Sequence, residues 1–315
     1  MFNLLNTRKK RIFGFLAGIL ILAGGYLLWA STAPSAPLPG RPQPTPAPTK
    51  FDGERAYEHV LHQTALGPRL PDSEAHARTR AWIRANLEAS GWIVETQPFT
   101  AMGHNGFNII AKRNRNATGS ILLGAHYDNR LIADHDPDLD KREQAVLGAN
   151  DGASGVAVLL ELGRVLPSEQ DDVWLVFFDL EDNGNIPTWD WILGSRAFVN
   201  GYALNAEKVK AAVILDMIGD ADLNIYLEKN SDLQIRTEIW AQAQALGHDN
   251  IFINEEKFSM LDDHTPFLEA GIPAVDVIDF DYPYWHTTED TADKVSAESL
   301  QIVGETMLAW LKNRP

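Results

Sequence analysis

Three short runs of almost uninterrupted apolar residues place the strongest constraint on the fold of this chain. They are SILLGAHYD at residues 120–128, VWLVFFDL at 173–180 and KVKAAVILDMIG at 208–219. Such runs are typical of strands that are buried on both faces, as in the centre of a sheet covered by helices. The sequence therefore predicts an α/β protein with a mixed, mostly parallel central sheet and helices on both of its faces.

The remaining periodic segments fit this architecture. Apolar residues at spacings of three and four predict helices at residues 51–70, 73–92, 153–166, 231–247 and 296–311. Shorter apolar or alternating segments predict strands at residues 92–99, 107–113 and 274–279. In sheets of this kind ligands bind beyond the carboxyl ends of the strands, so the candidate site is expected there.

The first 50 residues have a different character. A basic cluster, RKKR at residues 8–11, precedes a run without any charge at residues 12–30, which is long enough to cross a bilayer. We expect a cytoplasmic tail (1–11), a transmembrane anchor (12–30), a proline-rich linker (31–50) and an extracytoplasmic folded domain (51–315). A cleaved signal peptide, which would release a secreted protein, is the alternative.

Composition excludes several functions. The net charge of −16 argues against nucleic acid as a partner, because no basic surface stands out beyond the N-terminal cluster. The chain has no cysteine, which excludes disulfides, thiolate metal sites and a cysteine nucleophile. The sequence patterns of phosphate-binding loops, dinucleotide-binding folds, zincin helices and serine hydrolase elbows are also absent. Any metal must therefore be held by His, Asp and Glu.

Potential metal ligands stand at the ends of several predicted strands and in nearby loops: His126, Asp151, Asp182, Asp216 and His286. Zinc binds imidazole nitrogen and carboxylate oxygen, and a catalytic zinc keeps one position open for water or substrate. Each residue also has a simpler interpretation, such as a helix N-cap for Asp151, a turn former for Asp216 and a core imidazole for His126. Caps and turns do not require five such residues at one edge of one sheet, which favours a zinc site.

Residues around these candidates support the same interpretation. Gly148, Gly152 and Gly155 flank Asp151 and would let the backbone turn sharply and approach an ion. Asp128, two residues after His126, is a candidate to hydrogen-bond that imidazole or a neighbouring ligand. A solvated acid in a turn is the alternative for Asp128.

Six ordered motifs carry a resemblance to a known family. The motifs HYD, GANDGASGVAVLLEL, FFDLED, LDMIG, DDHTPF and WHTTEDTADKV resemble peptidase family M28, which contains zinc aminopeptidases and related glutaminyl cyclases. The resemblance covers about residues 51–315. The resemblance implies a three-layer α/β/α fold and a zinc held by Asp151, Asp182 and His286. His126 and Asp216 would hold a second zinc if one binds, with Asp151 between the two.

The resemblance also implies that Glu181 is the catalytic acid–base. Adjacent side chains on a strand point to opposite sides, so Glu181 and Asp182 are expected to have different tasks. In an aminopeptidase the base activates a zinc-bound water for hydrolysis. In a glutaminyl cyclase it relays a proton from the α-amine of an N-terminal glutamine to departing ammonia. Both reactions act on peptide N-termini. One zinc suffices for the cyclase, and two remain possible.

Three details favour the cyclase. The acid pair is Glu then Asp, where many aminopeptidases have Glu then Glu. Trp189, Trp191 and Trp285 resemble tryptophans of the cyclase pocket, and Asp263 with Asp216 resembles its proton network. The tryptophans are equally compatible with ordinary packing, and Asp276 stands where animal cyclases carry histidine. We predict a cyclase, with an aminopeptidase as the alternative and a non-catalytic receptor-like ectodomain as a distant third.

Overall fold

A six-stranded sheet forms the centre of the protein, in the order β1-β2-β4-β3-β5-β8. The computed structural model describes residues 48–113, 120–168 and 172–314. The parallel part consists of β3 (Ile121–His126), β4 (Val173–Phe178), β5 (Ala211–Asp216) and β8 (Ala274–Ile278). An antiparallel edge is formed by β1 (Ile93–Ala101) and β2 (His104–Lys112). The mixed, mostly parallel sheet is therefore confirmed.

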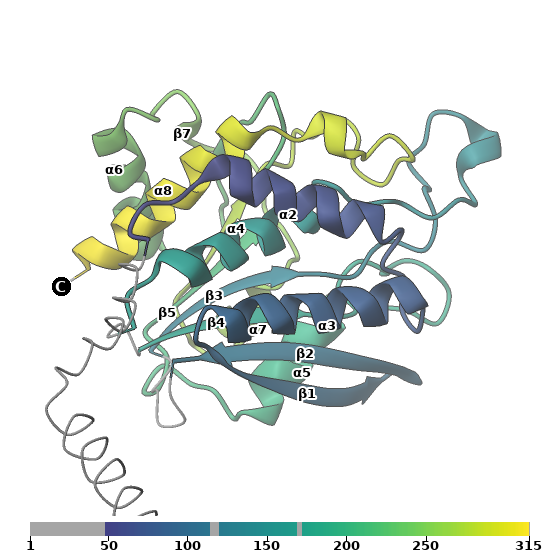
Figure 1. Ribbon diagram of the computed structural model, residues 1–315, viewed down its shortest axis with the longest axis horizontal. Helices are drawn as coiled ribbons and strands as arrows, with labels where there is room; N and C mark the ends of the chain where they lie inside the picture. Colours follow the sequence, from purple (N-terminus) through teal and green to yellow (C-terminus); the bar gives the residue numbers. More distant parts are fainter. Residues whose placement is uncertain (1–47, 114–119, 169–171, 315) are drawn as a thin grey trace, which may run out of the picture. The chain divides into compact units, whose positions relative to one another are not determined.

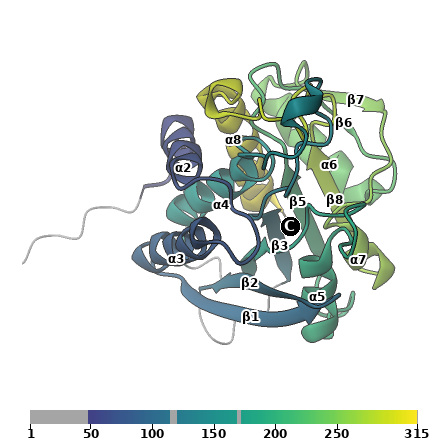
Figure 2. The same ribbon diagram turned by 90° about the vertical axis from the view of Figure 1, so that its right-hand side faces the viewer.

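Helices cover both faces of this sheet, as predicted. One face is covered by α3 (Glu74–Ala89), α4 (Ala153–Val165) and α6 (Leu233–Leu246), which contact the strands. Helices α2 (Gly53–Ala65) and α8 (Ala297–Asn313) belong to the same layer and pack against α4. The other face packs against α5 (Leu193–Gly201) and α7 (Thr265–Glu269). Figure 2 shows α2, α3 and α4 on one side of β3 and β5, with α5 and α7 on the other. In β4, Leu175 and Phe177 face the first layer, whereas Trp174 and Val176 face the second, because strand side chains alternate.

Helix α4 lies between α2 and the sheet (Figure 1). All of its residues except Arg164 are buried, as expected of a helix that is apolar nearly all round. Its first residue, Ala153, follows directly after the GANDG segment. The loop that carries Asp151 is therefore attached to one of the most deeply buried elements of the fold.

Some elements have no clear sequence signal. Helix α5 begins after Ile192, whose φ of 55° is left-handed and whose side chain makes no cap. Helix α7 and the separate parallel pair β6 (Ile225–Leu227) and β7 (Phe252–Glu256) are too short to give a periodic pattern. Two short 3-10 helices, Leu139–Lys141 and Ala292–Lys294, complete the set of described elements.

The predicted cytoplasmic tail and transmembrane anchor, residues 1–30, lie outside the described residues, as does nearly all of the linker. Over residues 48–113, 120–168 and 172–314, no helix is both long and apolar enough to span a bilayer. The anchor and the domain boundary at residue 51 therefore stay predictions.

Candidate metal centre and active site

The carboxyl edge of the parallel strands brings all five predicted metal ligands together. His126 is the last residue of β3 and Asp216 the last of β5. Asp182 follows β4, Asp151 precedes α4, and His286 lies in the loop before α8. All five side chains are buried. Convergence at this edge follows from the parallel arrangement, which places the ends of neighbouring strands side by side.

The five residues form two overlapping groups of three. In one group, His286 Nε2 lies 2.8 Å from Asp182 Oδ1 and 3.7 Å from Asp151 Oδ2. In the other, His126 Nε2 lies 2.9 Å from Asp151 Oδ1 and 3.2 Å from Asp216 Oδ1. Within each group the donor atoms lie within 4.8 Å of one another. Because Asp151 belongs to both groups, the arrangement has room for one ion, or for two ions that share this carboxylate.

The donor atoms fit a zinc ion. Asp151 Oδ2 and Asp182 Oδ2 are buried and have no hydrogen-bond partner among the described residues. Buried polar atoms of this kind normally have a partner, so a bound cation accounts for them. The set offers imidazole nitrogen and carboxylate oxygen, which zinc prefers. The N-cap interpretation of Asp151 is wrong, since the N-cap of α4 is Gly152 and no side chain caps this helix.

Glycine is required beside the candidate centre. A Cβ on Gly152 would lie 2.4 Å from His126 Nε2, too close for any side chain. Gly148 has a φ of 65°, and a Cβ there would lie 1.7 Å from Asn129 Nδ2. The glycines of the GANDG segment therefore allow the backbone to approach the candidate ligands, as the sequence suggests.

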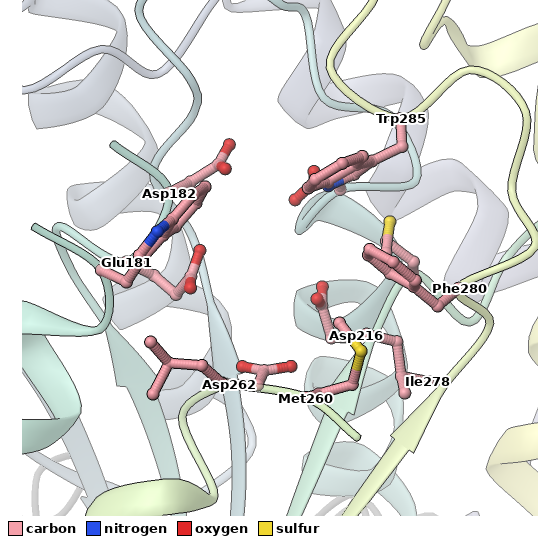
Figure 3. Close-up of a pocket in the computed structure, with 12 residues that line it drawn as sticks. Glu181, Asp182, Asp216, Met260, Asp262, Ile278, Phe280 and Trp285 are labelled. Carbon is pink, nitrogen blue, oxygen red and sulfur yellow. The ribbon is translucent and has the colours of Figure 1, made fainter. Parts of the chain in front are cut away.

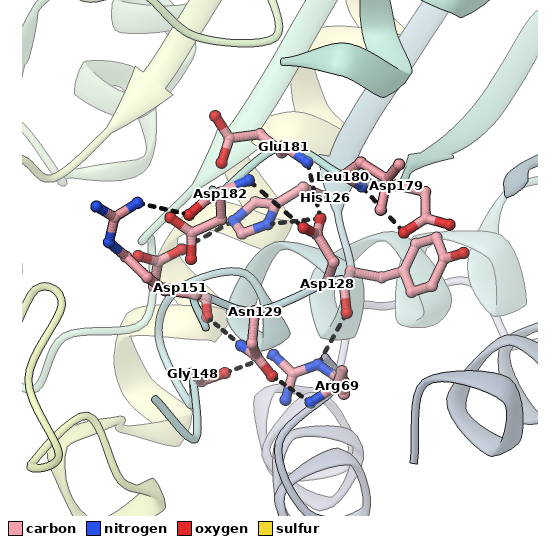
Figure 4. A network of polar contacts seen from close by, with 12 residues as sticks. Arg69, His126, Asp128, Asn129, Gly148, Asp151, Asp179, Leu180, Glu181 and Asp182 are labelled. Atoms are coloured by element: carbon pink, nitrogen blue, oxygen red, sulfur yellow. Dashed lines mark hydrogen bonds and ion pairs between the residues drawn. The ribbon is translucent and has the colours of Figure 1, made fainter. Parts of the chain in front are cut away.

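The acid pair lies in a turn after β4 and not in the strand itself. The strand ends at Phe178, and Leu180 has a left-handed φ of 56°. Asp128 accepts hydrogen bonds from the backbone N–H groups of Glu181 (3.0 Å) and Asp182 (3.4 Å), as Figure 4 shows. The argument from strand alternation is therefore wrong, and the turn held by Asp128 separates the two side chains. Asp182 joins a metal-ligand group, and Glu181 joins neither.

Asp128 also lies beside a metal-ligand candidate. One of its carboxylate oxygens is 3.6 Å from His126 Nδ1, which has no hydrogen-bond partner among the described residues. The prediction named the imidazole or a neighbouring ligand as its contact. Asp128 instead accepts hydrogen bonds from the backbone N–H groups of Glu181 and of the candidate ligand Asp182. Its separation from the His126 imidazole is that of an ion pair.

Burial shifts the charges of the site. Burial raises the pKa of Glu181 well above its ordinary value. The charge of nearby His126 lowers this pKa, and the charge of Asp182 raises it further. It also raises the pKa of Asp182 well above the ordinary value and that of Asp216 to about 7. The pKa of His286 falls to about 3 through burial, so this imidazole is neutral, as a metal ligand must be. Crowded buried carboxylates need protons or a cation to balance them, which again favours a metal.

A pocket with a volume of about 200 Å³ opens beside the acid pair (Figure 3). Five carboxylates and seven apolar or aromatic side chains line it: Asp151, Glu181, Asp182, Asp216, Asp262, Trp191, Met217, Met260, Leu261, Ile278, Phe280 and Trp285. None of these lining residues is Lys or Arg. The pocket thus combines an acidic floor near the candidate metal with aromatic walls.

Two of the three predicted pocket tryptophans line this pocket, Trp191 and Trp285. Trp189 does not, and that prediction is corrected. Its ring stacks on His104 of β2, with ring centres 3.5 Å apart. The backbone around the two tryptophans is irregular, with left-handed φ values at Thr188 (75°) and Ile192 (55°), so their spacing in the sequence does not predict which ring enters the pocket.

The predicted role of Asp263 in the proton network is the second prediction that is corrected. Its side chain is fully buried and does not line the pocket, whereas its neighbour Asp262 does. Consecutive side chains in the turn before α7 point in different directions. The DDH motif alone therefore does not tell which of its two aspartates, Asp262 or Asp263, lines the pocket. Asp262 and Asp216 are the aspartates of this part of the pocket, as Figure 3 shows.

Two residues that support the site are not among the predicted site residues. Asp290 accepts hydrogen bonds from the backbone of Asn150 (2.8 Å) and Asp151 (3.2 Å). Arg69 is fully buried and donates to the carbonyl oxygens of Tyr127 and Gly148. These two side chains hold the loops that carry the candidate ligands. The only available signal for Asp290 is its place at the end of the WHTTED motif.

The fold and the site define a zinc-dependent enzyme of the α/β/α exopeptidase type. The sequence profile of peptidase family M28 matches residues 108–311, and the chain belongs to this family. The chain is similar to the glutaminyl-peptide cyclotransferase of Boiga irregularis, with 26% identity over an alignment of 302 positions, which includes 82% of this chain and 80% of that protein.

Solved structures of two bacterial proteins are also similar over almost their whole length. One is the glutaminyl cyclase of Bacteroides thetaiotaomicron bound to N-acetylhistamine (30% identity, TM-score 0.78, 84% of this chain and 99% of that chain). The other is a Zn-dependent exopeptidase from Parabacteroides distasonis (29% identity, TM-score 0.78, 84% of this chain and 99% of that chain). Cyclases and exopeptidases thus both resemble this chain closely.

Proposed function

We propose that the protein is a zinc-dependent glutaminyl-peptide cyclotransferase, which converts an N-terminal glutamine into pyroglutamate and releases ammonia. The position of Glu181 carries this proposal. Its buried carboxyl group lines the pocket beside the candidate metal ligands, yet it belongs to neither ligand group. A carboxyl group in that position is available to move a proton within the substrate.

The reaction needs one proton relay and no water. The α-amine nitrogen attacks the carbonyl carbon of the side-chain amide, and the bond from that carbon to the amide nitrogen breaks. Glu181 accepts the proton that the α-amine loses and donates it to the departing nitrogen, which leaves as ammonia. Because burial raises the pKa of Glu181, its carboxyl group is suited to both accepting and donating the proton.

The residues that would hold zinc are Asp151, Asp182 and His286, with His126 and Asp216 as further ligands if a second ion binds. A zinc ion at this position would polarise the carbonyl group of the side-chain amide. One ion is sufficient for the cyclisation, because no water has to be activated.

The pocket suits a single terminal residue. Its volume of about 200 Å³ is below the range of about 300–1,000 Å³ that is usual for larger ligands. Trp191 and Trp285 provide flat apolar walls, and the lining offers no basic side chain to pair with a carboxylate. These properties favour a neutral glutamine side chain over an anionic glutamate.

An M28 aminopeptidase is the second candidate. The complete group formed by His126, Asp151 and Asp216 favours it, because a second metal ion would serve to activate a water. The test offers the full-length protein one peptide that begins with Gln and one that begins with Leu. We expect ammonia and pyroglutamate from the first and no free leucine from the second. Release of both terminal amino acids would establish the aminopeptidase, and no reaction with zinc bound would favour a receptor-like protein.

We also propose that residues 12–30 anchor the protein in the cell membrane, with the N-terminus in the cytoplasm. The uncharged run and the basic cluster before it support this proposal. The full-length protein should stay in the membrane fraction at high pH, and added protease should reach its catalytic domain only from the outside. Recovery of a shortened, soluble protein would instead indicate a cleaved signal peptide.

A further inference from the structure

Arg130 is a buried cation beside the pocket that the proposed reaction does not use. Only 2% of its surface is exposed. Its Nε and Nη2 donate to the two carboxylate oxygens of Asp134, at 2.8 Å and 2.7 Å. Two parallel hydrogen bonds of this kind fix both the distance and the orientation of the two groups. Arg130 and Asp134 therefore behave as one rigid unit.

The third nitrogen of this guanidinium holds the backbone of Asp182 and of the segment after it. Nη1 donates to the carbonyl oxygens of Asp182 (2.8 Å) and Gly184 (3.1 Å). The unit is thereby connected to the backbone of a proposed metal ligand. Since Asp128 holds the same segment through its N–H groups, the turn is fixed from two sides.

The same unit reaches a second proposed ligand and the pocket wall. Asp134 Oδ1 lies 3.7 Å from His286 Nδ1, a buried nitrogen without a hydrogen-bond partner among the described residues. The guanidinium carbon of Arg130 lies 5.0 Å from the ring centre of Trp191, a cation–π contact. The Trp191 ring is in turn stacked parallel to the His286 ring, with centres 6.0 Å apart.

We propose that the Arg130–Asp134 pair is a positioning unit, which holds Asp182 and His286 in the geometry for zinc and sets Trp191 as the wall of the substrate pocket. This inference rests on the proposed metal site and deepens it. The role requires arginine, because a lysine ammonium is a point charge that cannot make the two parallel hydrogen bonds and also lie over an aromatic ring.

The test measures zinc affinity of the full-length protein by competition with a chelator, which does not depend on the reaction catalysed. Replacing Arg130 by Lys should weaken zinc binding by about 10–100-fold, as usual for residues that support metal ligands. Arg236→Lys is the matched control. Arg236 is also buried, and it donates to the backbone carbonyl of Glu228 and to the carboxylate of Glu256. It lines a different pocket from the one beside the candidate metal ligands. The control should lose comparable stability and keep its zinc affinity.

If Arg130 acted only as a positive charge, it would repel the zinc ion, and the variants would give the opposite results. Arg130→Ala would then bind zinc more tightly than the unchanged protein, and Arg130→Lys would bind it equally well. Either result would overturn the proposal. If Arg130→Ala fails to fold, Arg130→Lys still decides between the two roles.

Two further variants separate the parts of the inference. Asp134→Asn should also weaken zinc binding, and an unchanged affinity would overturn the link to His286. In the Gln-peptide assay, Arg130→Lys should raise KM as well as lower kcat, because the Trp191 wall is released. Asp182→Ala serves as the reference: if that variant keeps its zinc, the proposed metal site is wrong, independently of Arg130.

Discussion

Replacing Glu181 by Gln separates proton transfer from metal binding. Gln has nearly the same shape, so the change creates no cavity around this buried side chain. Glu181 belongs to neither metal-ligand group, and its backbone N–H is held by Asp128. Zinc content should therefore stay the same. The fold should not lose stability, because burial disfavours the charged form of Glu181 and Gln carries no charge.

Turnover of a Gln-peptide should fall by about 10²–10⁴-fold, the usual contribution of a general acid–base. This range corresponds to about 3–5 kcal/mol of activation free energy. Asp262 is the only other carboxylate among the described pocket-lining residues that lies outside both metal-ligand groups. Any residual proton transfer should pass through it, so the double variant with Asp262→Asn should lose more activity than Glu181→Gln alone.

The assay combines elemental analysis for zinc with kcat and KM for the Gln-peptide. A rise in KM with unchanged kcat would assign Glu181 to substrate binding. Loss of zinc from the Gln variant would refute the division of tasks between Glu181 and Asp182. Unchanged turnover with full zinc would refute the proton relay itself.

Four further substitutions test the site. Asp182→Ala should lower zinc occupancy, because it removes a ligand, and unchanged zinc on elemental analysis would contradict the ligand assignment. Gly152→Ala should disturb His126, since the added Cβ would lie 2.4 Å from its Nε2; we expect a lower melting temperature and weaker zinc binding, and an unaffected protein would count against this geometry. Trp191→Ala should raise KM for the Gln-peptide, whereas Trp189→Ala, which alters a ring stacked outside the pocket, should leave KM nearly unchanged. Equal effects of the two tryptophan changes would argue against the pocket assignment.

The sequence predicts the central architecture because burial on both faces leaves uninterrupted apolar runs. Strands β3, β4 and β5 are buried along their whole length and are visible as apolar runs. His126, Asp182 and Asp216 are predictable because parallel strands present their ends at a common edge. Asp151 and His286 lie in loops, and the resemblance of their motifs to family M28 is what predicts them. Helix α5 leaves no comparable trace, since it is short and begins without a capping side chain.

The finer parts of the site depend on backbone turns that a sequence does not display. Leu180, with its left-handed φ, decides where Glu181 and Asp182 point, and strand alternation does not apply there. A similar local turn places Asp262 in the pocket in place of Asp263. The sequence does not predict the role of Arg130, because this side chain acts through hydrogen bonds to the carbonyl oxygens of Asp182 and Gly184, which are distant along the chain.

The product formed from a Gln-initiated peptide tests the central proposal most directly. The zinc-loaded, full-length protein is incubated with the peptide in isotopically labelled water, and the product is analysed by mass spectrometry. Cyclisation predicts a peptide that keeps every residue, has lost one ammonia and carries no label from water. Free glutamine, with label incorporated at the cleaved carbonyl, would contradict the cyclotransferase and identify a hydrolytic aminopeptidase.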